Sequence, residues 1–202
     1  MSNPEIDFFD SIAPRWDADE VVSVPERINP LLDLLTWRPA MRVLDLGTGT
    51  GVLLPYLSAR TAPGGSILAV DFSQGMLAEA RRKFEALPSV SFLCADFEAD
   101  AIPGTFHLVM LYSVYPHLKQ PCATLRRLLD SNVTPGGSIV VAFPVSESFI
   151  NSIHGQKKAP ADLLPPAGEL ARRFRSWGFN AEALASSPEA YMVRILKERC
   201  RS

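Results

Sequence analysis

The chain has 202 residues, of which 47% are hydrophobic, enough apolar material for one domain with a large core. Its formal net charge is −2 and its pI is near 5.9, so no overall basic field favours nucleic acid or an anionic membrane. The three cysteines are odd in number and lack metal-ligand spacing, which argues against a disulfide framework. We expect a cytoplasmic monomer or homodimer without a signal peptide, a membrane span or a bound metal.

The first part of the chain, residues 1–38, is expected to form a helical cap. A helix that ends at Pro14 has an apolar face made of Phe8, Phe9 and Ile12. A second amphipathic helix carries apolar residues at helical spacing, namely Ile28, Leu31, Leu32 and Leu35. Pro30 allows two interpretations of this second helix. Either Asn29 caps a short helix that begins at Pro30, or a longer helix is kinked there.

The segment Met41-Arg-Val-Leu-Asp-Leu-Gly-Thr-Gly-Thr-Gly51 predicts a buried strand, a glycine-rich turn and the start of a helix. Glycines tolerate unusual backbone angles and let a ligand approach the main chain closely. Such a turn is where a nucleotide-like cofactor lies in an open α/β sheet. The nicotinamide fingerprint G-x-G-x-x-G does not fit, because its third glycine would fall at Val52.

Two further strands are expected to end in carboxylates. The apolar run Ser66–Asp71 ends at Asp71, which can accept both ribose hydroxyls of an adenosine. Ser73 caps the next helix, which turns apolar residues inward: Met76, Leu77, Ala80 and Phe84. The run Val90–Asp96 predicts the third strand. Because the carboxyl ends of parallel strands line the ligand crevice, Asp71 and Asp96 should face one site.

The second half of the chain predicts the rest of a sheet. Strand four covers Phe106–Tyr112, and a helix that opens at Gln120 and Pro121 leads to strand five over Ser138–Phe143. The following segment, 144–166, lacks clear periodicity, and long loops in compact domains are usually functional or disordered. A last helix then ends at Gly178. Two final strands follow it, Phe179–Ala185 and Tyr191–Lys197.

Three stretches, VLDLGTGTG, VDFSQGML and CADFEADAI, resemble the ordered motifs of class I S-adenosylmethionine-dependent methyltransferases, from about Met41 to Phe143. The N-terminal FFDSIAPRWD is similar to a segment of small-molecule methyltransferases of the ubiquinone-biosynthesis type, which folds over the cofactor. The resemblance implies a single methyltransferase domain over 1–202, doubly wound and Rossmann-like. Its seven-stranded sheet should have the order 3-2-1-4-5-7-6 with strand seven antiparallel. It also implies methyl transfer from S-adenosylmethionine to a small molecule, with S-adenosylhomocysteine as product.

The resemblance and the strand ends together give a set of candidate cofactor residues. By resemblance, Asp96 accepts a hydrogen bond from the adenine amino group and Phe97 lies against the ring. Arg15 could pair with the methionine carboxylate, or it could be a surface arginine. The full expected set is Arg15, Asp45, Gly47, Thr48, Gly49, Gly51, Asp71, Phe72, Met76, Asp96, Phe97 and Tyr112. For Phe72, ordinary packing is the alternative.

The acceptor side of the site is expected to come from three segments. Its candidate substrate residues are Phe8, Trp16 and Tyr115, with plain core packing as the alternative for the N-terminal aromatics. His117, in the loop after strand four, is the first candidate for a general base, needed only if the nucleophile arrives protonated. His154 is a second candidate, from a possible substrate lid over 144–166. Lys157 and Lys158 of this segment could favour an acidic substrate, and a surface loop is the alternative.

Two other functions stay open from the sequence. The first is a nucleotide-dependent oxidoreductase, which the missing third glycine opposes. The second is a non-catalytic protein that binds S-adenosylmethionine as a sensor or supports an active partner subunit. Methylation of nucleic acid is disfavoured, because the loop after strand four lacks the Asp/Asn-Pro-Pro-Tyr/Phe element of the nucleic-acid amino methyltransferases.

Overall fold

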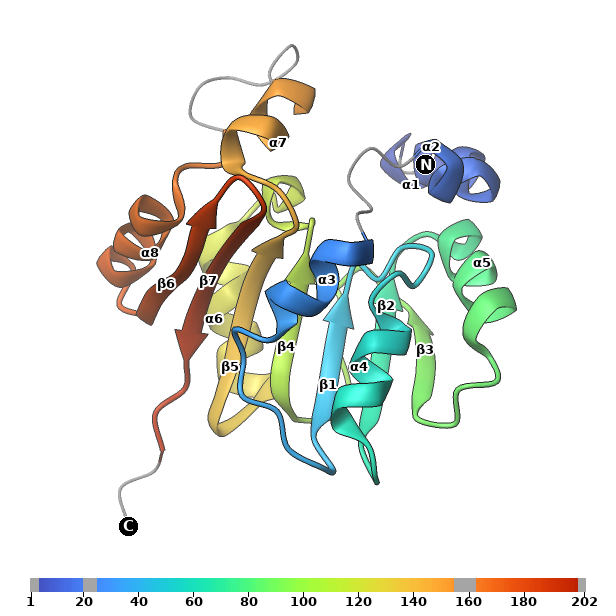
Figure 1. Cartoon of the computed structure of the whole chain (residues 1–202), viewed down its shortest axis with the longest axis horizontal. Coiled ribbons are helices and arrows are strands. Elements are labelled where there is room, and N and C mark those ends of the chain that lie inside the picture. Colours follow the sequence, from blue (N-terminus) through green and yellow to red (C-terminus); the bar gives the residue numbers. More distant parts are fainter. Residues whose placement is uncertain (1–3, 20–24, 155–162, 200–202) are drawn as a thin grey trace.

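The computed structural model of the chain describes residues 4–19, 25–154 and 163–199. Its strands, in chain order, are β1 (Arg42–Leu46), β2 (Ser66–Asp71), β3 (Val90–Cys94), β4 (Phe106–Tyr112), β5 (Val133–Phe143), β6 (Asn180–Ser187) and β7 (Ala190–Leu196). They form one sheet in the order β3-β2-β1-β4-β5-β7-β6 (Figure 1). Neighbours are parallel, except that β7 is antiparallel to both β5 and β6. The predicted fold class, strand order and antiparallel seventh strand are confirmed.

Helices connect the strands, and other helices lie beyond the carboxyl ends of the parallel strands. In chain order they are α1 (Pro4–Ile12), α2 (Trp16–Asp19), α3 (Pro25–Leu32), α4 (Leu54–Thr61), α5 (Gln74–Phe84), α6 (Pro121–Asn132), α7 (Glu147–His154) and α8 (Ala167–Ser176). Two short 3-10 helices accompany them, η1 (Ala13–Arg15) and η2 (Tyr115–His117). In the part of the chain that the structure describes, no helix is both long and apolar enough to cross a membrane.

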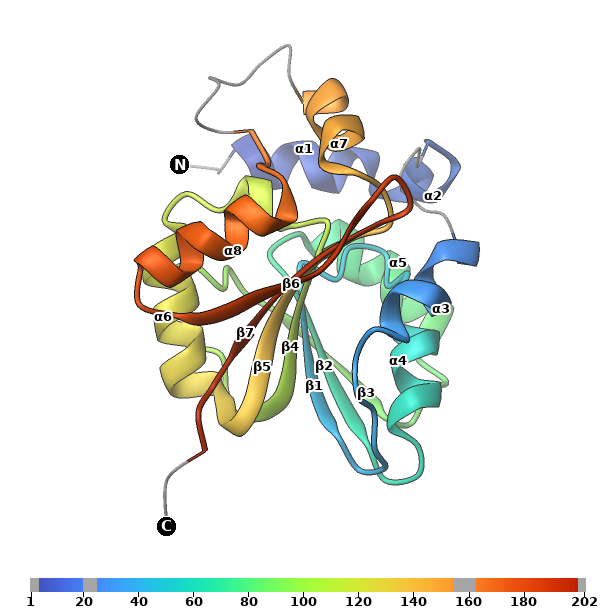
Figure 2. The same cartoon turned by 60° about the vertical axis from the view of Figure 1, so that its left-hand side comes forward.

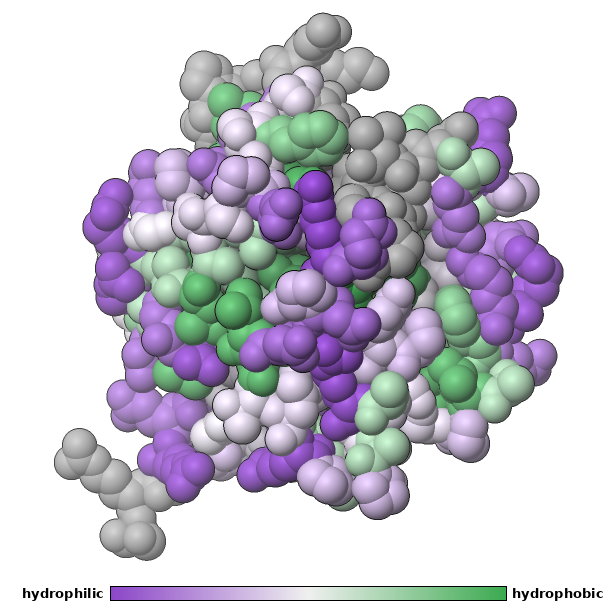
Figure 3. All heavy atoms as spheres, in the orientation of Figure 1, coloured by the Kyte–Doolittle hydropathy of each residue, from purple (hydrophilic) through white to green (hydrophobic). Residues whose placement is uncertain are grey.

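The sheet is the middle layer of three. Figures 1 and 2 show α3, α4 and α5 over one face and α6 and α8 over the other. Strand side chains alternate between the faces, so each face has its own core: Val43 packs with α3 and α4, whereas Leu44 packs with α6 and α8. Figure 3 shows hydrophobic residues gathered at the left of the α3/α4 face, over β6 and β7, where no helix lies in front of the sheet.

The carboxyl ends of the parallel strands are overlaid by segments from two distant parts of the chain. In both ribbon views α1 and α2 lie beyond this edge of the sheet, and so does α7 (Figures 1 and 2). The predicted N-terminal helices are present. Pro30 lies inside α3, so this helix does not begin at Pro30 and is the longer of the two that the sequence allows. These segments and the strand ends enclose the site described below.

The structure differs from the sequence-based expectation at three places, of which one is β3, which ends at Cys94, two residues before Asp96. A helix, α7, occupies part of the segment predicted to be irregular; the Ser146 hydroxyl accepts the N–H of Phe149 at 3.3 Å and thereby caps it. Strand β5 begins at Val133 rather than Ser138, because Val133 already pairs with Phe106 before the register shifts. Hydrophobic periodicity is a poor guide to these last two features, since α7 has only eight residues and the start of β5 carries Pro135, Gly136 and Gly137.

Candidate active site

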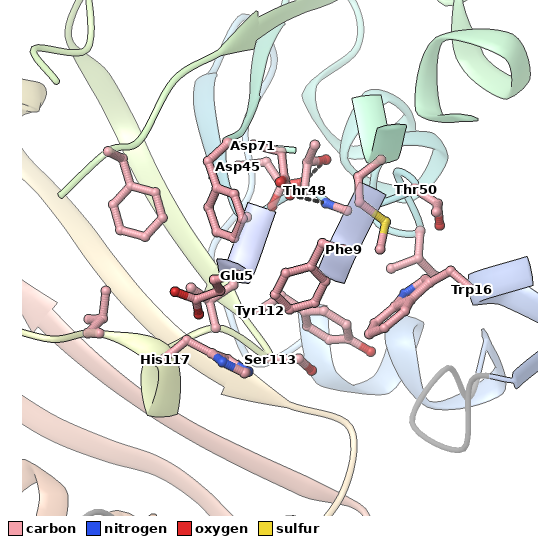
Figure 4. Close-up of a pocket in the computed structure, with 18 of the residues that line it drawn as sticks. Glu5, Phe9, Trp16, Asp45, Thr48, Thr50, Asp71, Tyr112, Ser113 and His117 are labelled. Atoms are coloured by element: carbon pink, nitrogen blue, oxygen red, sulfur yellow. Dashed lines mark hydrogen bonds between the residues drawn. The ribbon is translucent and has the colours of Figure 1, made fainter. Parts of the chain in front are cut away.

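A cavity of about 530 Å³ lies at the carboxyl ends of β1, β2 and β4, and Figure 4 shows many of its lining residues. One wall is the glycine-rich loop after β1 together with the residues that end β2 and follow β3. The opposite wall comes from α1 to α2, from the loop after β4 and from Ile150 of α7. The cavity therefore sits at the edge of the sheet where ligands bind in open α/β folds.

The three glycines of the loop after β1 serve different purposes. All have positive φ angles, +66° for Gly47, +54° for Gly49 and +87° for Gly51, a conformation that favours glycine. A Cβ on Gly47 would lie 2.5 Å from Val114 Cγ2, and one on Gly51 would lie 2.9 Å from the Phe84 ring. A Cβ on Gly49 would meet no protein atom within 4 Å. Gly47 and Gly51 thus permit close packing, whereas Gly49 leaves its side of the loop open for a ligand.

Two buried carboxylates lie at the cavity beside this loop. Asp45 accepts a hydrogen bond from the Thr48 hydroxyl at 2.7 Å, and burial, aided by the charge of Asp71, raises the pKa of Asp45 to about 7. Asp71 accepts the N–H groups of Gly49 and Ser73, each at 2.9 Å. Burial raises the pKa of Asp71 as well, although its backbone hydrogen bonds oppose this. Asp71 therefore fixes the glycine loop against the start of α5.

The residues that follow β2 and β3 continue the same wall. Phe72, Met76, Asp96 and Phe97 all line the cavity. The Asp96 carboxylate accepts the N–H of Glu98 at 2.9 Å, which orients it in its turn. Ser73 caps α5 through the N–H of Met76 at 3.0 Å, as the sequence predicts. The positions expected to hold an adenosine are thus brought together along one wall.

The N-terminal segment is held over the cavity by two aspartates. Asp10 accepts hydrogen bonds from the Ser73 hydroxyl at 2.5 Å and from the Gly75 N–H at 2.8 Å. Asp17 accepts from the Thr50 hydroxyl at 2.5 Å and from Lys83 at 2.7 Å. Partial burial acts to raise the pKa of Asp17, but the hydrogen bonds from Lys83 and Thr50 outweigh it and lower the pKa below its usual value.

An aromatic cluster joins the N-terminal segment to the cavity walls. The Phe9 ring makes edge contacts with Phe72, Trp16 and His117, at centroid distances of 5.6, 5.9 and 6.2 Å. In Figure 4 it lies between the carboxylates of Asp45 and Asp71 and the ring of His117. Phe8 also lines the cavity although it is 56% exposed. Phe9, which belongs to the predicted apolar face of the first helix, therefore lines the cavity as well.

The loop after β4 supplies polar groups to the far side of the cavity. Tyr112, Ser113 and His117 all line it. Ser113 has a φ of +60°, which is unusual for a residue other than glycine. Its hydroxyl is buried and has no hydrogen-bond partner among the described residues. A buried polar group of this kind favours a ligand that can hydrogen-bond to it.

Five of the predicted positions lie elsewhere or cannot be described. Gly51 does not line the cavity and instead lets α4 and Phe84 pack closely. Tyr115 is buried in the core, with its ring 5.6 Å from that of Phe174, so it is not a wall of this cavity. His154 ends α7, but its side chain lies outside the described residues, as do Lys157 and Lys158. Every other candidate residue named from the sequence lines the cavity.

Several lining residues carry no signal that a short motif would reveal. They include Glu5, Ile12, Ser113, Val114, Leu118, Lys119, Phe143 and Ile150. Thr50 and Glu98 also line the cavity, and they lie inside two of the motifs quoted from the sequence. Glu5 pairs with Lys119 at 3.4 Å, which links α1 to the loop after β4. Among the residues described, no group of three or more His, Cys, Asp or Glu side chains is placed to hold a metal ion.

Comparisons with known proteins agree with this fold. A family described as a methyltransferase domain matches residues 43–137. The chain is 38% identical over 166 residues to a trans-aconitate 2-methyltransferase of Methylobacterium nodulans, covering 78% of this chain and 62% of the relative. It is 37% identical over 142 residues to a demethylmenaquinone methyltransferase of Thermus thermophilus, covering 66% and 62%. The chain spans 40% to 66% of the length of the curated relatives that it matches first.

A solved structure supports the fold over nearly the whole chain. The structure described as the DhpI-SAM-HEP complex has a TM-score of 0.73 and 20% identity, and the match covers 95% of each chain. At this identity the likeness concerns the fold. The motif order, the sheet order and the family match together support a class I S-adenosylmethionine-dependent methyltransferase domain that includes residues 43–137.

Proposed function

We propose that the protein transfers a methyl group from S-adenosylmethionine to a small-molecule acceptor. The observation that carries this proposal is the wall where Asp71 and Asp96 line the cavity beside the open side of Gly49. These groups follow two neighbouring parallel strands, as an adenosine site of this fold requires. The N-terminal segment lines the opposite wall of the cavity, and the rest of the cofactor would lie between the two walls.

The adenosine half of the proposed site fits the groups present. Each oxygen of Asp71 accepts one backbone N–H, and a carboxylate oxygen can accept a second hydrogen bond. Both ribose hydroxyls can therefore bond to Asp71 without displacing the glycine loop. Asp96 would accept from the adenine amino group, with Phe97 and Phe72 against the ring and Met76 beside it.

The methionine half would lie toward Asp45 and the N-terminal segment. Arg15 lines the cavity and would form a charge-assisted pair with the methionine carboxylate. Gly47, Thr48 and Tyr112 border the same space, and Asp45 lies beneath them. The cofactor supplies an activated sulfonium methyl group, so this chain chiefly orients the reactants and excludes water.

The acceptor would bind under the cover, next to the loop after β4. Phe8, Phe9, Trp16 and Ile150 give this end of the cavity an apolar lining, which suits a compact organic acceptor. His117 lies there too and would act as a general base for an acceptor that arrives protonated. We propose 144–166 as the substrate lid because Ile150, within it, lines the cavity. Residues 1–38 would form the cap of a single domain.

The relatives support a small acceptor rather than a macromolecule. Trans-aconitate and demethylmenaquinone, in the names of two relatives, are both small molecules, one anionic and one largely apolar. They disagree in charge, so the names favour no particular acceptor chemistry. The methyltransferase family match across the glycine loop argues against the oxidoreductase alternative.

A labelled-methyl assay tests the proposal. The protein is incubated with methyl-labelled S-adenosylmethionine and a library of small metabolites, and transfer of label to one class of acceptor is expected. His117→Ala should lower turnover of that acceptor by about 10²–10⁴-fold if the histidine is the base. Affinity for S-adenosylhomocysteine should stay nearly unchanged in this variant.

Two outcomes would decide against the proposal. Tight binding of S-adenosylhomocysteine without transfer to any acceptor would favour a sensor or a supporting subunit. Tighter binding of NAD than of S-adenosylhomocysteine would reinstate the oxidoreductase. Unchanged turnover in His117→Ala would remove only the role of the base.

A further inference from the structure

A second cavity, of about 260 Å³, lies at the opposite edge of the sheet from the first. It is bounded by the connector from α3 to β1, the start of β4, the turn within β5 and the segment at the end of β7. Its apolar walls include Leu35, Met41 and Leu108, which belong to the core on the α3/α4 face. Figure 1 shows the connector and the chain after β7 reaching this same edge, the amino ends of the parallel strands.

The lining of this cavity is strongly basic. Arg38, Arg194 and Arg199 all border it, and among the described residues that line it there is no aspartate or glutamate. Arg194 is paired with Glu182, whose carboxylate accepts its Nε–H at 3.0 Å. Among the described residues, Arg38 and Arg199 form no ion pair with a carboxylate. Two guanidinium charges at this cavity are thus left without an acidic partner from the described chain.

Arg199 is held at the cavity by the segment that carries it. Lys197 continues the ladder beyond β7, because its N–H donates to the Gly137 carbonyl at 2.9 Å and its carbonyl accepts the Gly136 N–H at 3.0 Å. The Lys197 ammonium donates to the carbonyls of Leu129 and Val133. Gly136 has a φ of +78°, and a Cβ there would lie 3.2 Å from the Arg199 side chain. The turn at Gly136 therefore packs closely against the Arg199 side chain.

His107 adds an uncharged donor to the same cavity. Its Nδ1 accepts the backbone N–H of Arg42 at 2.9 Å, so the proton of the neutral ring resides on Nε2. Burial lowers the pKa of His107, and the charges of Arg38 and Arg42 lower it further. Ser138 contributes a hydroxyl. The polar lining thus combines guanidinium groups with the neutral donors of His107 and Ser138. Such a set of groups binds an oxyanion through charge-assisted hydrogen bonds.

We propose that this cavity binds a phosphate-bearing small molecule at a site separate from that of methyl transfer. Two uncommitted guanidinium groups match the charge of a dianion, and their forks suit the three terminal oxygens of a phosphate. The volume of about 260 Å³ falls just under the range of drug-sized pockets, so the ligand is small.

Calorimetric titration with inorganic pyrophosphate, at constant ionic strength, tests this site. We expect binding with a dissociation constant below about 1 mM, weakened about tenfold or more by Arg38→Gln and by Arg199→Gln. Both arginines are exposed, so these variants should fold normally. Arg172→Gln, at an exposed position on α8, removes the same charge elsewhere and should leave binding unchanged. S-adenosylhomocysteine affinity should be the same in all four proteins, whether or not the proposed methyl transfer is correct.

Three outcomes would overturn the site. The first is no binding of pyrophosphate to the unaltered protein, and the second is an equal loss of binding in Arg172→Gln, which would indicate nonspecific charge. The third is displacement of pyrophosphate by S-adenosylhomocysteine. In a second arm, tighter binding of a short single-stranded RNA that Arg38→Gln abolishes would assign the site to a nucleic-acid backbone and overturn the small-molecule ligand.

Discussion

The two walls of the main cavity are built in different ways. The floor, which we define as the loop Gly47–Gly51 with the ends of β2 and β3, is fixed largely by backbone hydrogen bonds, such as that from Thr48 N–H to the Val70 carbonyl. The cover, which we define as residues 4–19 with α7, is held mainly by side chains such as Asp10 and Asp17. The floor is thus positioned by the backbone of the sheet, whereas the cover is a separate segment that side chains hold against the sheet.

This difference separates affinity for the cofactor from control of access. Backbone geometry preorganises the floor, so a ligand bound there requires little rearrangement. The cover contributes exposed groups, among them Phe8, and has fewer constraints on its position. We therefore expect floor variants to reduce cofactor affinity strongly and cover variants to reduce it weakly while opening the cavity.

The largest effect is expected for Gly49→Val. The side chain would enter the space that Gly49 leaves open, and overpacking against a ligand should lower S-adenosylhomocysteine affinity by roughly 100-fold or more. Strain at its φ of +54° should lower the free energy of unfolding by only about 1–2 kcal/mol. Calorimetry and thermal unfolding measure the two separately. Gly168→Val is the control. A Cβ on Gly168 also meets no atom within 4 Å, but Gly168 does not line the cavity, so this variant should keep full affinity for S-adenosylhomocysteine.

Asp71→Ala should come next. Loss of the hydrogen bonds to the ribose should weaken S-adenosylhomocysteine binding by about 1.5–3 kcal/mol. The variant should remain folded, as circular dichroism will report, and Asp130→Ala, an exposed carboxylate on α6, provides the control. Unaltered affinity in folded Asp71→Ala would mean that the ribose lies elsewhere.

The buried Asp45 should make stability depend on pH. Its folded-state pKa of about 7 lies above that of an unfolded aspartate, about 3.9, so between these values the folded protein binds the additional proton. The free energy of unfolding should therefore fall as pH rises from about 4 to 7, with a contribution of at most about 1.4 kcal/mol per pH unit. Urea unfolding of Asp45→Asn should lack this part of the slope. Parallel pH profiles for both proteins would show that Asp45 does not titrate in this range.

The smallest effect on affinity is expected in the cover. Asp10→Asn weakens two hydrogen bonds to the start of α5, so S-adenosylhomocysteine affinity should fall by about 0.5–1.5 kcal/mol. Trypsin should cleave faster after Arg15 in this variant, because the segment is released more often. Asp7→Asn, an exposed position on α1, should behave like the unaltered protein. If Asp10→Asn matched Gly49→Val in its loss of affinity, the distinction between floor and cover would be wrong.

The same distinction explains what could be predicted from the sequence. The floor is local: the apolar run before Gly47, the carboxylate that ends β2 and the one that follows β3 are each recognised within a few residues of sequence. The cover depends on distant partners, since Asp10 and Ser73 are 63 positions apart and Asp17 and Thr50 are 33 apart. No periodicity reveals such pairs. Tyr115 shows that a local prediction can also be wrong. The sequence places it among the substrate residues, but one turn of 3-10 helix directs its ring into the core.

Asn151 has a consequence for how new specificity could arise in this fold. Its side-chain amide donates to the Leu164 carbonyl at 2.8 Å and accepts the Leu164 N–H at 2.9 Å. These two bonds join the Asn151 side chain to the backbone of Leu164, so they do not depend on the identity of the residues between them. The free energy of closing a chain segment rises only slowly with its length, so insertions between residues 154 and 163 should scarcely change the free energy of unfolding. Because Ile150, next to Asn151, lines the cavity, this is the position where evolution or an engineer can exchange sequence beside the site and leave the sheet intact.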